Sequence, residues 1–447
     1  MPIAYVGIGS NLGDRHGHLE HAMRGIEALG TIVAGSPMYE TAPVGGPDQG
    51  PFLNAVAALD TDLSPYALLQ EVLGIERETG RVHRERWGPR TLDLDILWYD
   101  GQTIDEDGLT IPHPGIRDRR FVLAPLADVV PGLADSDGPY ADALGQVADQ
   151  TIQRISGPYD TQEQRWMVGI EAATALTGDG GTFQVDTPAD WENPTGDMFG
   201  AFLSAVVLRA VGEVAVGHQP SSLTYRFVHG VPQGAQIEVV PVKVRGSGRS
   251  ADYVVSLLVD GREMGRASVS TVTESRAVTI APEMPGVVPL SRCTPVDELF
   301  APVGRLTGAS MRSWRPLERW DIPDLVDGTS GVFRAWSPNL TLGTEDRFLR
   351  AAAILMPIDA LIWTSTMHQL GFLGSRKVVV TPTLEFSGRF PDLEHDPGWH
   401  LSEVHIEHMT DRSVSGTIRV WSEDGSYLSV GASHNLVISG ENLLEII

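Results

Sequence analysis

The sequence predicts an α+β domain followed by a second unit in which one α+β layout occurs twice. Three observations support this prediction. The chain has 447 residues, which is more than one ordinary hydrophobic core organises. Over roughly residues 1–155, helical and strand-like segments are interspersed and several strands are joined by hairpins. From residue 183 onward, an apolar helical segment followed by four β-rich runs appears twice.

Hydrophobic spacing and capping residues predict the elements of the first domain. Strands are expected at residues 3–8, 31–39, 52–60 and 92–98, where β-branched and apolar residues cluster. Helices are expected at residues 15–29, 64–79, 121–129 and 140–150. The first of these helices has an apolar face made of Leu19, Ala22, Met23 and Ile26. Ser64 and Pro65 supply an N-cap and a first-turn proline for the second helix.

Two carboxylates interrupt the apolar run that follows Gly88-Pro89. Asp93 and Asp95 are two positions apart, so in a strand they stand side by side on one face. Two adjacent carboxylates repel each other unless a cation lies between them. Mg²⁺ held by carboxylates and substrate phosphates is the natural candidate for this cation. Arginines upstream would bind the phosphates, and Trp87 offers a flat stacking surface. The alternative is that the arginines form only a solvated surface.

Composition excludes several classes of partner. The chain carries 33 Lys and Arg against 58 Asp and Glu, a formal net charge of -25, which argues against nucleic acid and anionic membrane as general partners. Its single cysteine, Cys293, permits no internal disulfide, so we expect a cytoplasmic protein. Its most apolar stretches are interrupted by Arg209 and Asp359, so no membrane span is expected.

The segment from Arg86 to Ile96 resembles the signature of 6-hydroxymethyl-7,8-dihydropterin pyrophosphokinases, and the resemblance extends over residues 1–155. It implies a ferredoxin-like α+β sandwich that transfers diphosphate from ATP to the pterin hydroxymethyl group, with AMP as the other product. It implies that Mg²⁺ binds to Asp93 and Asp95. The catalytic residues that it implies are Arg81, Arg90, Asp93 and Asp95. The ATP-binding residues that it implies are Glu76, Arg81, Arg84, Trp87, Arg90, Thr110, His113 and Arg119. The reduced pterin would be bound by Thr41, Val44, Phe52, Asn54, Trp87 and Phe121.

The second unit resembles the double hot-dog fold of acyl-CoA thioesterase II-like proteins. We expect a linker at residues 156–182, a first repeat at 183–275, a connection at 276–340 and a second repeat at 341–447. Matching hairpin turns at residues 259–261 and 423–425 support the duplication. Hot-dog sheets commonly pair edge to edge, so a homo-oligomer through this half is expected.

This second resemblance implies a carboxylate or amide near a central helix, together with Thr and Gln partners. The candidate residues are Asn193, Asp197, Gly200, Asp359, Thr383 and His434. For Asp359 we favour a structural explanation, an exposed helix residue or a kink after Pro357. The sequence leaves open whether this half hydrolyses acyl-CoA or is a non-catalytic module for acyl binding or assembly.

Overall fold

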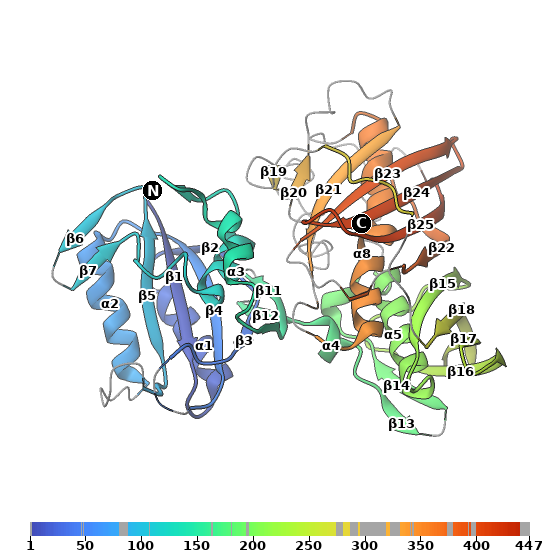
Figure 1. Cartoon of the computed structure of the whole chain (residues 1–447), viewed down its shortest axis with the longest axis horizontal. Coiled ribbons are helices and arrows are strands. Elements are labelled where there is room, and N and C mark those ends of the chain that lie inside the picture. Colours follow the sequence, from blue (N-terminus) through green and yellow to red (C-terminus); the bar gives the residue numbers. More distant parts are fainter. Residues whose placement is uncertain are drawn as a thin grey trace. The chain divides into compact units, whose positions relative to one another are not determined.

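The computed structural model describes residues 2–45, 47, 49–79, 88–106, 108–161, 164–179, 181–193, 196–273, 280–286, 294–295, 319–321, 331–339, 341, 344–372, 379–391, 393–394 and 399–438. The chain forms two compact units, Met1–Gly169 and Ile170–Ile447 (Figure 1). Each unit is described by itself.

An antiparallel sheet forms the centre of the N-terminal unit. Strand β1 (Ile3–Ser10) lies between β4 (Phe52–Asp60) and β5 (Asp93–Tyr99), and β4 also pairs with β2 (Thr31–Gly35) and β3 (Tyr39–Thr41). Strand β10 (Ile152–Arg154) extends the sheet beyond β3. Two short hairpins are separate, β6 (Ile104–Glu106) with β7 (Leu109–Ile111) and β8 (Ala134–Asp135) with β9 (Gly138–Pro139).

Helices cover both faces of this sheet. Helices α1 (Arg15–Glu27) and α2 (Pro65–Glu78) share one core with Val6, Ile8 and Leu94 of the sheet. Helix α3 (Arg120–Val129) and the 3-10 helix η1 (Tyr140–Val147) share the other core with Val56 and Leu97. The predicted apolar face of α1 is confirmed, and Ser64 caps α2 by accepting from the Ala67 N–H.

Two strands lie where the sequence predicts a linker. Strand β11 (Ser156–Asp160) pairs with β2 through Tyr159 and Gly35, and β12 (Arg165–Val168) pairs with β11. The physical reason is aromatic burial: Tyr159 and Trp166 are 1% and 6% exposed, and their ring centroids lie 5.0 Å apart. The Trp166 indole N–H also donates to the Ser36 carbonyl over 2.8 Å. These residues therefore complete the N-terminal unit.

The C-terminal unit contains the predicted duplication. The first copy comprises β14 (Thr182–Asp186), α5 (Gly200–Val214), β15 (Gln219–Phe227), β16 (Gln236–Gly246), β17 (Ser250–Val259) and β18 (Arg262–Val272). The second comprises β21 (Val332–Pro338), α8 (Arg347–Gln369), β22 (Thr383–Arg389), β23 (Trp399–Met409), β24 (Ser413–Ser422) and β25 (Tyr427–Leu436). Each copy thus has one strand before its helix that the predicted four-strand scheme omits, and β21 lies inside the predicted connection.

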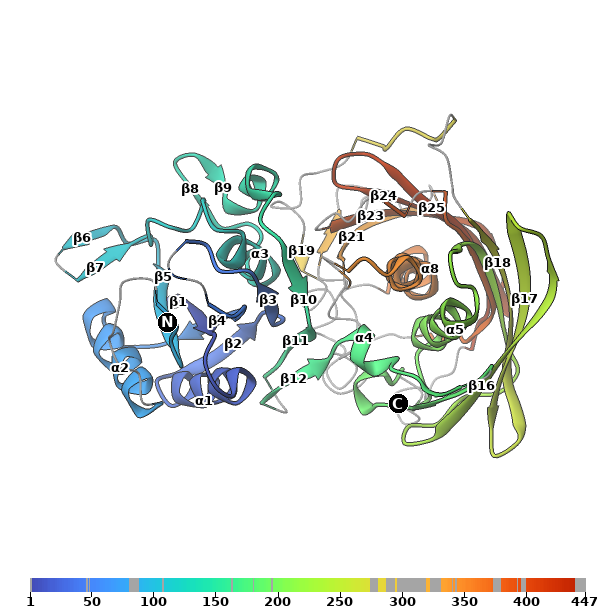
Figure 2. The same cartoon turned by 60° about the horizontal axis from the view of Figure 1, so that its bottom comes forward.

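One curved sheet joins the two copies. Its central strand order is β14-β16-β17-β18-β15-β22-β25-β24-β23-β21, with β15 and β22 pairing where the copies meet. At the ends of this path lie β13 (Thr177–Asp179) and the short strands β19 (Thr294–Pro295) and β20 (Arg319–Asp321), while α4 (Ile170–Ala173) and η2 (Ala189–Trp191) precede α5. The sheet wraps around α5 and α8 (Figure 2). Helix α8 is long and apolar enough to cross a membrane, but its apolar window is 100% buried, as in a core helix.

Candidate functional site

The paired carboxylates of the N-terminal unit lie on β5, which pairs with the central strand β1. Gly9 of β1 is opposite Asp93 on one side and Asn54 on the other, and Gly7 is opposite Asp95. A side chain at position 9 would place its Cβ only 3.1 Å from the Asn54 Oδ1 atom. The small residue in the central strand therefore allows polar side chains from the strands on both sides to approach one another.

The groups around the pair influence one another electrostatically. Burial raises the pKa of Asp95 above its ordinary value, and the charge of Asp93 raises it further. His113, Arg90 and Arg119 oppose this rise. Burial lowers the pKa of His113, while the charge of Asp95 raises it. Arg90 forms an ion pair with Asp93, with 2.6 Å between Nη1 and Oδ2.

This donor set fits Mg²⁺. Two carboxylates share one face of β5, and each is held in a charge environment where an added cation would relieve their repulsion. Among the described residues, no group of three or more Asp, Glu, His or Cys side chains forms a metal cage. Mg²⁺ commonly uses one or two carboxylates and completes its shell with water and substrate phosphates.

Glu76 and Asn11 hold the loops and strands around the pair. Glu76 is 2% exposed, and its Oε1 accepts a hydrogen bond of 2.7 Å from the N–H of Leu94. Leu94 is the residue between the two aspartates. Asn11 accepts the Arg90 N–H over 2.8 Å and donates to Gln49 over 2.9 Å. Asn11 was not among the predicted site residues, although its position directly after β1, between Gly9 and Gly13, is a signal for a polar loop beside the sheet.

Three of the residues predicted to bind the pterin, Thr41, Phe52 and Asn54, lie on the strands β3 and β4. The Asn54 amide donates to the Thr41 hydroxyl over 2.8 Å, and both side chains are buried. Phe52 pairs with Thr41 across β3 and β4, while Val44 is 54% exposed in the loop between them. Phe121 is partly buried, and the Arg119 guanidinium lies 5.8 Å from its ring centroid. Thr110 is exposed on β7. Arg81, Arg84 and Trp87 lie outside the described residues.

A second candidate site lies inside the C-terminal unit, where Asp359 of α8 meets the N-terminus of α5. Asp359 is 6% exposed, which corrects the expectation of an exposed helix residue. Its Oδ2 accepts the Ala201 N–H over 3.0 Å, and its Oδ1 accepts the Thr383 hydroxyl over 3.1 Å. Gly200 makes the approach possible, because a Cβ there would lie 2.7 Å from Oδ2. The positive end of the helix dipole favours a carboxylate in this position.

Asn435 completes this network, and the prediction of His434 was wrong. Thr383 of β22 is opposite Asn435 of β25, whose amide donates to the Thr383 hydroxyl over 2.9 Å. Asn435 also donates to the Thr381 carbonyl and accepts from the Ser433 hydroxyl. His434 points to the other face of β25 and is exposed, because successive strand residues alternate in direction.

A cavity of about 290 Å³ opens onto this network. Five of the six predicted residues line it, namely Asn193, Asp197, Gly200, Asp359 and Thr383. Burial raises the pKa of Asp359 to about 6, while hydrogen bonds from Thr383, Ala201 and Gly200 oppose the rise. Burial also raises the pKa of Asp197. A carboxylate with a pKa near 6 in an apolar cavity is suited to accept a proton at neutral pH.

The first copy has no carboxylate at the helix position equivalent to Asp359, which lies within the described residues. Asp359 follows the first residue of α8 by twelve positions, and Gly212 follows that of α5 by the same number. A Cβ on Gly212 would lie 3.1 Å from the Phe348 ring near the start of α8. The position equivalent to Asp359 is therefore filled by aromatic packing in the first copy.

Comparison with known proteins agrees with this division into two units. Residues 5–131 match the family model of 7,8-dihydro-6-hydroxymethylpterin-pyrophosphokinase. A 2-amino-4-hydroxy-6-hydroxymethyldihydropteridine pyrophosphokinase of Methylorubrum extorquens is 42% identical over 157 residues, which cover 35% of this chain and 99% of that protein. One from Pseudomonas aeruginosa is 44% identical over 156 residues, covering 34% of this chain and 96% of the relative.

The C-terminal unit has matches of its own. Residues 187–273 match the family model of the acyl-CoA thioesterase N-terminal domain. The solved structure of an acyl-CoA thioesterase II, TesB2, from Mycobacterium marinum covers 61% of this chain and 99% of its own, with a TM-score of 0.50 and 15% identity. This likeness shows that the second unit has the thioesterase-like double hot-dog fold.

Taken with the fold and the carboxylate pair, these matches place the N-terminal unit among the transferases of folate biosynthesis. The chain belongs to the 7,8-dihydro-6-hydroxymethylpterin-pyrophosphokinase family, here joined to a double hot-dog domain.

Proposed function

We propose that the N-terminal domain transfers diphosphate from ATP to the hydroxymethyl group of 6-hydroxymethyl-7,8-dihydropterin, giving AMP and the pterin diphosphate. The observation that carries this proposal is the pair Asp93 and Asp95 on one face of β5, with Arg90, His113 and Arg119 acting on it. Relatives of at least 42% identity that carry the pyrophosphokinase name support it.

The residues divide into a metal-binding group and a pterin-binding group. Asp93 and Asp95 would hold Mg²⁺, which neutralises phosphate charge when bound. Transfer of this kind depends mainly on alignment and charge neutralisation, so it requires no protein nucleophile. The Asn54 amide, which donates to Thr41, would pair with the edge of a pterin ring.

The test measures AMP formed from ATP with the reduced pterin and Mg²⁺. The full chain should form AMP only when the pterin is present, and Asp95→Asn should remove this activity while the circular dichroism spectrum stays unchanged. Asp105→Asn, an exposed position on β6, is the matched control and should retain activity. Undiminished turnover in Asp95→Asn would refute the metal assignment, and no AMP from the full chain would refute the proposed activity.

A second activity, hydrolysis of acyl-CoA thioesters, is favoured for the C-terminal unit. The specific observation is the buried Asp359 at the end of the cavity, held by Ala201 and Thr383. In the proposed reaction, Asp359 takes a proton from a water molecule while the oxygen of that water attacks the thioester carbonyl. The C–S bond then breaks, the thiolate receives that proton, and a carboxylic acid and free thiol are released.

Thiol release from octanoyl-CoA tests this second activity. Asp359→Asn should reduce kcat by about 10²-fold or more, which is typical for loss of a general base. Asp346→Asn, at the N-cap of α8, is the matched control and should retain activity. If the full chain binds the ester without releasing thiol, the alternative of a non-catalytic acyl-binding module replaces the hydrolase.

We also infer a cytoplasmic protein that forms homo-oligomers through the C-terminal sheet. The acidic composition and the small-molecule substrates of the proposed reactions support the location. Light scattering of the full chain tests assembly, and a monomer mass would refute it.

A further inference from the structure

The cavity of the C-terminal unit has one open end and one buried end. At the open end, Val228 is 47% exposed, and the adjacent His229 and Gly230 are exposed as well. At the buried end, Asp359 is 6% exposed and Leu203 is 2% exposed. An elongated ligand that fills the cavity from Asp359 to these exposed residues would therefore have its other end beside His229.

A cation is held at this open end. Nη2 of Arg262, the first residue of β18, lies 2.9 Å from Nε2 and 3.2 Å from Nδ1 of the cavity-lining His229. An arginine is always protonated, so Arg262 donates to the imidazole through Nη2, and a guanidinium carries further N–H donors besides those of Nη2. The backbone holds the pair in place, since the His229 N–H donates to the Met264 carbonyl over 3.0 Å.

The charge of Arg262 is not neutralised by a neighbouring acid. Arg266, on the same strand, pairs with Glu263 at 2.8 Å, and Arg245 pairs with Asp252 at 2.8 Å. Within the described part of the chain, no carboxylate lies within ion-pair distance of Arg262. Asp197 also lines the cavity, but it packs against Gly230, where a Cβ would lie 2.1 Å from its Oδ2. In a chain of net charge -25, a cation left unpaired at a cavity mouth indicates an anionic ligand.

We propose that Arg262 and His229 form a phosphate-binding subsite at the open end of the C-terminal cavity. Its ligand is a phosphate group of a phosphopantetheine-type thiol carrier, whose acyl end lies toward Asp359. Guanidinium groups suit this role because their planar N–H donors match phosphate oxygens. The inference rests on the proposed thioester chemistry and extends it, since it makes the enzyme selective for phosphorylated carriers over simple thioesters.

The kinetic test compares esters that differ only in phosphate. Octanoyl-CoA, octanoyl-phosphopantetheine and octanoyl-pantetheine are hydrolysed by the full chain and by Arg262→Gln. Loss of a charge-assisted hydrogen bond should raise KM for octanoyl-CoA about ten-fold more than KM for octanoyl-pantetheine. An effect already present with octanoyl-phosphopantetheine would identify the proximal phosphate as the ligand, and one confined to octanoyl-CoA would identify the distal phosphates.

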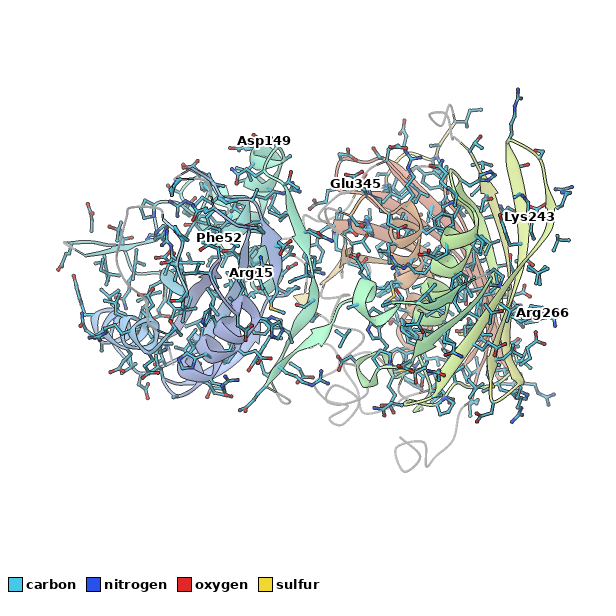
Figure 3. The ribbon with its side chains drawn as sticks, turned by 90° about the horizontal axis from the view of Figure 1, so that it is seen from below. Arg15, Phe52, Asp149, Lys243, Arg266 and Glu345 are labelled. Carbon is cyan, nitrogen blue, oxygen red and sulfur yellow. The ribbon has the colours of Figure 1, made fainter. Side chains whose placement is uncertain are left out.

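Arg266→Gln is the matched control, because Arg266 is exposed four residues along the same strand and projects outward from the sheet (Figure 3). It removes one positive charge without touching the cavity lining, so it should leave the KM ratio unchanged. An equal rise in KM for all three esters in Arg262→Gln, or the same ratio change in Arg266→Gln, would overturn the subsite.

Calorimetric titration separates failure of the subsite from failure of hydrolysis. Coenzyme A itself carries no acyl group, so its binding does not depend on whether Asp359 catalyses. It should bind the full chain more tightly than pantetheine does, and the preference should shrink in Arg262→Gln and at high salt. Equal binding of coenzyme A and pantetheine by the full chain would refute the subsite even if hydrolysis occurs.

Discussion

Replacing Asp359 with asparagine should stabilise the C-terminal unit at neutral pH while removing its proposed base. Burial raises the pKa of Asp359 from 3.8 to about 6, although Thr383 and two backbone N–H groups bind its charged form. At about 1.4 kcal/mol for each pH unit, ionisation of this side chain lowers the stability of the folded unit by up to about 3 kcal/mol. Asparagine has nearly the same shape, still accepts the Ala201 N–H and carries no charge.

The pH dependence gives this prediction a distinctive signature. Because the folded-state pKa of Asp359 lies above the unfolded value, the unmodified unit loses stability as the pH rises from about 4 to about 6. The gain from Asp359→Asn should therefore be near zero at pH about 4, grow up to pH about 6, and then stay constant. For a unit of this size, the largest gain corresponds to a rise in Tm of several degrees.

The assay must report on the C-terminal unit within the full chain. Amide hydrogen exchange of α5 and α8, measured by mass spectrometry at several pH values, follows the opening of that unit separately from the N-terminal domain. Asp346→Asn is the control: it removes a partly exposed pair with Arg209 at 2.9 Å, worth less than about 1 kcal/mol. Faster exchange in Asp359→Asn at pH about 7, or a gain that does not change with pH, would refute the reasoning.

Three further predictions concern the two sites. Thioester hydrolysis should rise with pH and level off above about 6, because Asp359 must lose its proton to act as a base; a pH profile of kcat/KM that is flat from pH 5 to 8 would contradict this. Asn435→Leu should lower both stability and hydrolysis, since it leaves the Thr383 hydroxyl and the Thr381 carbonyl without the donor that Asn435 supplies. The expected loss of stability is about 1–3 kcal/mol by chemical denaturation, and unchanged stability would show that water replaces the amide. Asn11→Ala should raise KM for ATP in AMP formation more than it lowers kcat, since it removes the side-chain acceptor of the Arg90 N–H; an unchanged KM would show that the remaining backbone bond to the Arg90 carbonyl holds the loop.

The paired aspartates were predictable because local rules determine their geometry. A strand places residues two positions apart on the same face, so Asp93 and Asp95 had to stand together once the surrounding run was recognised as β5. The capping of α2 by Ser64 and the apolar face of α1 follow from equally local rules. Each of these features needs only a few neighbouring residues to be specified.

Features that depend on distant partners were not predictable in the same way. Strand β11 meets β2 at Tyr159 and Gly35, and a Cβ at position 35 would lie 2.6 Å from the Tyr159 side chain. The irregular sequence around Tyr159 does not indicate that this segment pairs with β2. The partner residue, Gly35, lies more than a hundred residues earlier in the chain. The range predicted as a linker therefore includes a short strand that is stabilised by the partner it packs against rather than by its own pattern.

The apolar residues around Asp359 are a signal for burial of this side chain, but the sequence did not reveal its partner, the N-terminus of α5. An acid in a run of apolar helix residues must be exposed or paired, and the sequence alone does not choose between these outcomes. In the structure Asp359 is paired, because Gly200 has no side chain and the α5 backbone can approach until the Ala201 nitrogen lies 3.0 Å from the carboxylate. This contact joins helices from the two copies, so it depends on the tertiary structure and cannot be predicted from either segment alone.

The confusion of His434 with Asn435 has a more general cause. Thr383 is opposite Asn435, so the residues of β25 that face inward near the cavity are Gly431, Ser433 and Asn435. None of the three is apolar, and hydrophobic alternation therefore cannot reveal which face of this strand is buried. A strand that turns glycine, serine and asparagine toward a core leaves polar groups needing partners, and here those partners are Thr383 and the Thr381 carbonyl that support Asp359. The same inward polarity that obscured the register is what the proposed hydrolytic site requires.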